Sequence, residues 1–267
     1  MIIDCFMFAN ELDILEGRLQ YLYDRIDKFV IVESNLTFSG KTKPFNYLEN
    51  QERLVAYSDK IQYVKFTPDR TKYDFDKKLT EFDYSSGYWR FENDQRGAIT
   101  EALKDYPDDA LVVISDLDEI PSRNLIDITK KHLTPDVGAV VSFQDMFYFN
   151  LQHKELDQWR GTVITFNKYV QSNGAQWFRD NRFKLRGVLD SGWHLSYWGD
   201  PAFIQAKIIN SAHQEYNNAR YTDIDYIKQV VSEGKDLYGR DLKFVRVDAT
   251  TLPKDFLECF GKFEVTL

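Results

Sequence analysis

The chain has 267 residues, of which 43% are hydrophobic and 15% aromatic, so it is long enough to bury a large core. Its formal net charge is −8, and this acidic balance leaves no basic stripe with which a nucleic-acid scaffold would neutralise phosphates. The two cysteines, Cys5 and Cys259, lie far apart and are expected to be reduced thiols, which excludes a disulfide framework and a zinc site.

The amino-terminal stretch, MIIDCFMFANELD, begins directly with an apolar run. It has no basic region, and the run is too short and too interrupted for a signal peptide or a transmembrane segment. We therefore expect a soluble, cytoplasmic protein. The sequence leaves the oligomeric state open.

Apolar strands and amphipathic helices alternate over the first 120 residues. β-Branched apolar runs predict strands at residues 2–9, 29–32, 61–66 and 110–114, and helical spacing predicts helices at 11–23, 46–57 and 89–103. This alternation is typical of a doubly wound α/β sheet with flanking helices. Residues 67–87 are charged, aromatic and aperiodic, which indicates a loop that contacts substrate.

The strand at residues 110–114 is followed by an acid cluster. Asp116, Asp118 and Glu119 come within four positions of each other, directly after the apolar run and Ser115. Because carboxylates are costly to bury, the cluster should lie at the carboxyl edge of the sheet, where open α/β folds bind ligands. Asp116 and Asp118 can ligate Mn²⁺ or Mg²⁺, which in turn holds substrate phosphates. The alternative is a solvated acidic turn that ends at Pro121.

The second half of the chain has a mixed pattern. Ser122 caps a predicted helix that ends at His132, and residues 137–149 and 162–170 predict strands of a mixed or antiparallel part of the sheet. Residues 201–213 and 222–234 predict closing helices. Because there is no internal repeat and no linker, we expect a single domain over residues 1–267 with a helical C-terminal part.

The run at residues 176–200 is rich in tryptophan and arginine. Within it, His194 follows Trp193 and is a candidate metal ligand, although a histidine beside a tryptophan is more often a hydrogen-bonded core residue. Asp190 is either a general base or a turn acid. Four arginines can bind phosphates through guanidinium forks or can form surface ion pairs: Arg96, Arg179, Arg182 and Arg186.

Polar residues at the ends of the first two strands stand where a doubly wound sheet binds a nucleotide base or ribose. No glycine-rich phosphate loop occurs, so a bound diphosphate would depend on a metal ion for most of its neutralisation. The candidate nucleotide-binding residues are Asn10, Glu11, Glu33, Gln95, Arg96, Asp116 and Arg179.

Several stretches together resemble glycosyltransferase family 17. The combination of FVIVES-x-x-T-F-S-G-K with SDLDEIP, together with ENDQR and GWHLSY, carries the resemblance over residues 3–199. It implies a GT-A-type fold and a nucleotide-sugar donor, with UDP-N-acetylglucosamine as the family-level expectation. It also implies a divalent cation and the donor diphosphate at Asp116 and Asp118, with His194 as a further metal ligand. Residues 1–120 would then bind the nucleotide sugar, 121–200 the acceptor and metal, and 201–267 would form C-terminal helices.

The function that follows is a metal-dependent, inverting transfer of a sugar from a nucleotide diphosphate to a hydroxyl of a glycan or small acceptor. Inversion needs a carboxylate base, for which Asp190 is the first candidate and Asp145 the second. Two alternatives remain at this point. One is a phosphohydrolase with Asp116 as nucleophile and Asp118 as acid, and the other is a sugar-binding protein without catalysis.

Overall fold

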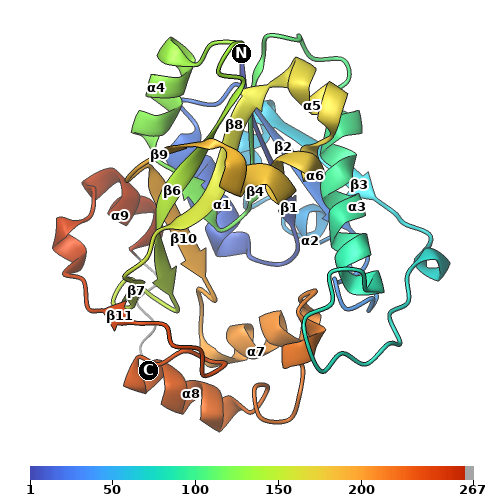
Figure 1. The fold of residues 1–267 in the computed structure, drawn as a ribbon, viewed down its shortest axis with the longest axis vertical. Helices are drawn as coiled ribbons and strands as arrows, with labels where there is room; N and C mark the ends of the chain where they lie inside the picture. The colour runs from blue at the N-terminus through green and yellow to red at the C-terminus, as the bar shows by residue number, and fades with distance from the viewer. Residues whose placement is uncertain (262–267) are drawn as a thin grey trace.

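The structure is a computed structural model that describes residues 1–261, with helices on both faces of a mixed sheet (Figure 1). Four parallel strands in the order β3-β2-β1-β4 form one side of the sheet. Their bounds are β1 Ile2–Phe8, β2 Lys28–Ser34, β3 Ile61–Phe66 and β4 Leu111–Asp116. All four carboxyl ends therefore point to one edge, where the chain leaves the sheet in polar segments.

The other side of the sheet is mostly antiparallel. β8 (Trp159–Phe166) pairs with β4, and β6 (Ala139–Tyr148) pairs with β8, both antiparallel. β10 (Gly192–Ser196) runs parallel to β6 and antiparallel to β5 (Glu119–Pro121). The remaining short strands are β7 Lys154–Glu155, β9 Arg186–Val188 and β11 Phe244–Val245. This arrangement confirms the mixed sheet that the sequence predicts.

Side chains of the central strands alternate between two cores. Phe6 of β1 packs in one cluster with Leu15 of α1 (Leu12–Leu22), whereas Cys5 packs in the other with Ile99 of α3 (Gly87–Ala102). A strand buried on both faces needs an apolar layer on each, and the uninterrupted apolar runs supply it. The prediction of a doubly wound sheet is therefore correct.

The other helices pack in these two cores or, toward the C-terminus, in a third apolar cluster. They are α2 Asn46–Glu49, α4 Arg123–His132, α5 Asn167–Asn173, α6 Ala175–Asn181, α7 Pro201–Asn210, α8 Ile224–Glu233 and α9 Lys254–Phe260. The α7, α8 and α9 helices fall in the predicted C-terminal part, of which residues 262–267 lie outside the described residues. In residues 1–261, no helix combines the length and the apolar character needed to cross a membrane.

Two predicted elements differ from the structure. The helix expected at residues 46–57 stops at Glu49, because the Asn50 side chain donates to the Asn46 carbonyl and competes with the continuing backbone. The strand expected at 162–170 ends at Phe166 and gives way to α5. There, the buried Asn167 side chain donates to the carbonyls of Leu103 and Tyr106, which fixes the change of direction.

Candidate functional site

A cavity of about 520 Å³ lies at the carboxyl edge of the parallel strands. Its walls come from the ends of β1 and β4, from α3, α6 and β10, and from α7, which faces the sheet edge across the lower part of Figure 1. Phe82 and Tyr84 of the segment 67–87 also line it. The acid cluster therefore opens on a cavity, as the strand-end reasoning expected, and is not a solvated turn.

One buried arginine holds the backbone of the turn that carries the acid cluster, residues 116–119. Arg18 of α1 is fully buried and donates two bonds to the equally buried Asp4, at 2.8 and 2.6 Å. Its Nη1 also donates to the backbone carbonyls of Asp116, Leu117 and Glu119 at 2.9–3.0 Å. A single guanidinium thus satisfies most of the carbonyls of this turn, which sets the direction of the side chains above it.

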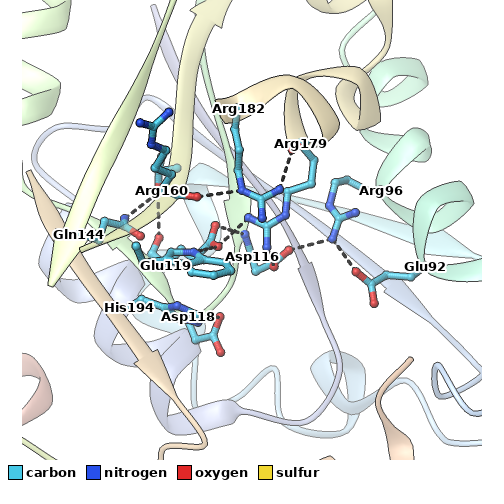
Figure 2. A network of polar contacts seen from close by, with 12 residues as sticks. Glu92, Arg96, Asp116, Asp118, Glu119, Gln144, Arg160, Arg179, Arg182 and His194 are labelled. Atoms are coloured by element: carbon cyan, nitrogen blue, oxygen red, sulfur yellow. Dashed lines mark hydrogen bonds and ion pairs between the residues drawn. The ribbon is translucent and has the colours of Figure 1, made fainter. Parts of the chain in front are cut away.

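Asp116 is enclosed by guanidinium groups. Its Oδ1 accepts from Arg96 of α3 at 2.9 Å and its Oδ2 accepts from Arg179 of α6 at 2.6 Å (Figure 2). Burial by itself would raise the pKa of this carboxyl, but Arg179 and Arg96 outweigh it and lower the pKa to about 2. Arg179 also donates to the fully buried Glu119 at 2.6 Å. Both oxygens of Asp116 are therefore occupied by protein groups.

Asp118 has a different environment, on the His194 side of the cavity. Its Oδ1 lies 3.5 Å from Nε2 of His194, and its Oδ2 accepts from Nζ of Lys207 on α7 at 2.8 Å. Burial opposes ionisation, but Lys207 and His194 hold the pKa of the Asp118 carboxyl well below its usual range. β10 places His194 here through its pairing opposite Glu119. Figure 2 shows the Asp118 and His194 side chains next to each other.

The donor set at Asp118 and His194 suits a divalent cation. An oxygen of the Asp118 carboxylate and Nε2 of the His194 imidazole face one another, and both residues line the cavity. Within residues 1–261, no group of three or more His, Cys, Asp or Glu side chains is arranged to hold a metal. Mg²⁺ and Mn²⁺ commonly take one or two protein ligands and complete their shell with phosphates and water, so this pair fits such an ion. Asp116 fits it less well, because both of its oxygens are engaged.

The candidate nucleotide-binding residues divide between two cavities and the core. Asn10 and Glu11 line the main cavity, and Asn10 also lines an adjoining cavity of about 250 Å³ together with Gln95. Glu33 lines neither. Its buried carboxylate accepts from Nζ of Lys43, from the backbone at the start of α2, and from the Tyr63 hydroxyl. It therefore anchors α2 and does not lie where a ligand could reach it.

The two acids predicted as general bases lie outside the cavity lining. Asp145 forms an ion pair with Lys154 at 2.7 Å, and the exposed Asp190 accepts from Gln158 at 2.6 Å. Gln158 also donates to Asp145 at 3.2 Å, so one amide bridges both carboxylates. A base must come within hydrogen-bond reach of the proton it removes, and a substrate held in the cavity is not next to these groups.

Sequence reasoning did not identify two contributors to the cavity. Lys207 lies on a helix whose apolar spacing predicted only a closing element, and nothing near it in sequence signals its contact with Asp118. The second contributor is an aromatic wall whose residues come from six separate segments of the chain. Its members include Trp89, Tyr148, Trp159, Tyr197, Tyr216 and Tyr238.

Curated relatives of this chain share one enzyme name. The human and mouse proteins called beta-1,4-mannosyl-glycoprotein 4-beta-N-acetylglucosaminyltransferase are 21% and 22% identical to it over all of its length. The match covers 55% and 54% of those two proteins, so the chain spans about half the length of the curated relatives it matches.

Solved structures that match this chain include a synthase and a xylosyltransferase. A 4-diphosphocytidyl-2C-methyl-D-erythritol synthase from Anaerococcus prevotii matches with a TM-score of 0.42 at 12% identity, covering 72% of this chain and 87% of that one. Mouse xyloside xylosyltransferase 1 matches with a TM-score of 0.33 at 10% identity, covering 70% and 76%. At the level of sequence, the family described as glycosyltransferase family 17 matches residues 1–242. This chain therefore belongs to glycosyltransferase family 17, and its mixed sheet with flanking helices has the architecture that the sequence predicts.

Proposed function

We propose that the protein transfers N-acetylglucosamine from a UDP-linked donor to a hydroxyl group of a glycan, with inversion and with a divalent cation, Mn²⁺ or Mg²⁺. The observation that carries the proposal is the Asp118–His194 pair, which opens on a cavity at the sheet edge of a family 17 chain. The name of the curated relatives supports N-acetylglucosamine as the sugar and a mannose-containing acceptor as the first to test. A small hydroxyl acceptor is the second.

The two adjoining cavities support binding of the nucleotide-sugar donor in two parts, one part in each cavity. The smaller one, with the amides of Asn10 and Gln95 in its lining, has the donors and acceptors that a base and ribose need. Gln95 is held there by its bond to the Val32 carbonyl at 3.1 Å. The main cavity, with Asp118 and His194, then takes the diphosphate and the sugar.

Asp118 and His194 are the residues that would hold the cation. When bound, the ion supplies positive charge that stabilises the diphosphate as it leaves. The role of Asp116 is separate, because its carboxylate orients Arg96 and Arg179 at the cavity wall. This pairing also disfavours the phosphohydrolase alternative, in which Asp116 would need a free oxygen to attack phosphorus.

The base that activates the acceptor hydroxyl should be a cavity carboxylate. Five acids line the main cavity: Glu11, Glu92, Asp116, Asp118 and Asp180. In the described structure, Glu92, Asp116 and Asp118 form ion pairs, whereas Glu11 and Asp180 form none. We therefore place Glu11 and Asp180 ahead of Asp190 and Asp145 as candidate bases.

The test is a transfer assay with UDP-N-acetylglucosamine, Mn²⁺ and a mannose-containing glycan, in which UDP release and the mass of the product are followed. Asp118→Asn should lower turnover by about 10²–10³-fold, the range found when one group that stabilises the transition state is removed. Whichever of Glu11→Gln and Asp180→Asn abolishes turnover identifies the base. Retention of activity in Asp190→Asn supports a base that lies in the cavity.

Two results would count against the proposal. Release of inorganic phosphate without an acceptor would favour the phosphohydrolase. Glycan binding that needs neither nucleotide nor metal, without turnover, would favour a sugar-binding protein.

A further inference from the structure

The cations that line the main cavity are almost all neutralised by neighbouring carboxylates. Arg96 pairs with Glu92 and Asp116, Arg179 with Asp116 and Glu119, Lys207 with Asp118, and Arg240 with Asp236. Arg182 is the exception. Of the lysines and arginines that line the cavity, it alone has no carboxylate of residues 1–261 within ion-pair distance.

Arg182 is nevertheless held in a defined position. Its Nε donates to the carbonyl of Arg160 at 2.9 Å, and its Nη1 donates to the carbonyl of Arg179 at 2.7 Å. The guanidinium carbon lies 5.3 Å from the centroid of the Trp159 ring and 4.5 Å from that of Phe183. Its Nη2 makes no hydrogen bond to any residue of the described chain. Figure 2 shows Arg182 beside Arg179, above Asp116.

The charge of Arg182 is present at neutral pH, and Glu119 and Asp116, which lie beyond ion-pair distance, offset it only in part. Burial, followed by repulsion from Arg179, lowers the pKa of its guanidinium to about 10. A group with this pKa is almost fully protonated at pH 7. A partly buried cation whose bonds are all to neutral groups attracts an anion, and a guanidinium with a free Nη2 suits a phosphate oxygen.

We propose that Arg182 binds the diphosphate of the nucleotide donor in the main cavity. This inference rests on the proposed function. It selects one of the four arginines predicted from the sequence as phosphate ligands, because the charges of Arg96 and Arg179 are already paired with Asp116, Glu92 and Glu119. Arg182 can bind a phosphate without competing with an ion pair. At Arg96 and Arg179, a phosphate would have to share the guanidinium with the carboxylates already paired to it.

The test is isothermal titration calorimetry of the full chain in Mn²⁺ with UDP, UMP, uridine and inorganic pyrophosphate. A charge-assisted hydrogen bond of this kind corresponds to a loss of about tenfold or more in affinity when it is removed. We expect Arg182→Gln to weaken UDP and pyrophosphate by that factor and to leave uridine unchanged. Arg182→Lys, which keeps the charge and loses the fork, should fall between the wild type and Arg182→Gln.

The matched control is Arg160→Gln. The Arg160 guanidinium packs against the rings of Phe143 and Phe183 but does not line the cavity, and its carbonyl remains available to Arg182. UDP affinity in this variant should equal that of the wild type. If Arg182→Gln and Arg182→Lys both bind UDP as the wild type does, the inference is wrong while the proposed function stands. If the wild type binds uridine and UDP equally or binds neither, both fail.

Discussion

The buried Arg18–Asp4 ion pair leads to a prediction about the stability of the fold. Arg18→Leu would leave the Asp4 carboxylate, which has no exposed surface, without its cation. Breaking a buried pair from one side costs about 3–5 kcal/mol, because the remaining charge stays desolvated. The same change removes the donor for three turn carbonyls and for Oγ of Ser115. We therefore expect a loss at the upper end of this range, equivalent to roughly 10 °C in melting temperature.

The assay is urea unfolding followed by circular dichroism, with Arg25→Leu as the control. Arg25 forms an exposed ion pair with Asp127, so its loss should cost less than about 1 kcal/mol. The double variant Asp4→Leu, Arg18→Leu should recover about 1–3 kcal/mol relative to the sum of the single variants, because it removes both charges. A cost below about 1 kcal/mol for Arg18→Leu would refute the reasoning.

Three further predictions use other parts of the structure. Gly97→Ala should stabilise the fold by about 0.5–1 kcal/mol, since nothing lies within 4 Å of the added Cβ in the interior of α3. Gly87→Ala should destabilise it by about 1–3 kcal/mol, because the added Cβ would clash with the Asp74 carbonyl. Urea unfolding should therefore show changes of opposite sign in the two variants. Burial, the largest cause, raises the pKa of the Tyr21 hydroxyl to about 12. The fold therefore keeps the full stability contribution of Tyr21 below pH 10 and loses about 2–3 kcal/mol between pH 10 and 12. Tyr21→Phe should not show this loss, and the same pH profile of stability in the variant and the wild type would contradict the prediction. Phe82→Ala should raise the acceptor KM without changing stability, because its ring lines the cavity yet is 57% exposed; an unaltered KM would remove the segment 67–87 from substrate binding.

Much of the site follows from local sequence signals. The apolar run of β4 ends at the acids, so Asp118 could be placed at the sheet edge without a structure. His194 follows a glycine and a tryptophan in a short strand, and the structure brings it to Asp118 as the family resemblance implied. The first prediction depends on residues next to the site, whereas the second depends on the family resemblance.

The pairings could not be predicted, because they arise from packing between distant segments. Arg96 and Arg179 reach Asp116 from α3 and α6, which are 20 and 63 residues away in sequence. Periodicity predicts that such helices are amphipathic but not which polar residue meets which acid. For the same reason Glu33, which ends a strand as a ligand-binding residue would, proved to hold the start of α2.

The central claim is that a cation and a nucleotide diphosphate bind at Asp118 and His194. A crystal of the protein grown with MnCl₂ and UDP-N-acetylglucosamine, measured for the anomalous signal of manganese, tests this directly. We expect one peak within bonding distance of the Asp118 carboxylate and Nε2 of His194, in contact with the diphosphate. A nucleotide bound in the cavity with no manganese at that pair, or manganese bound elsewhere, would contradict the account.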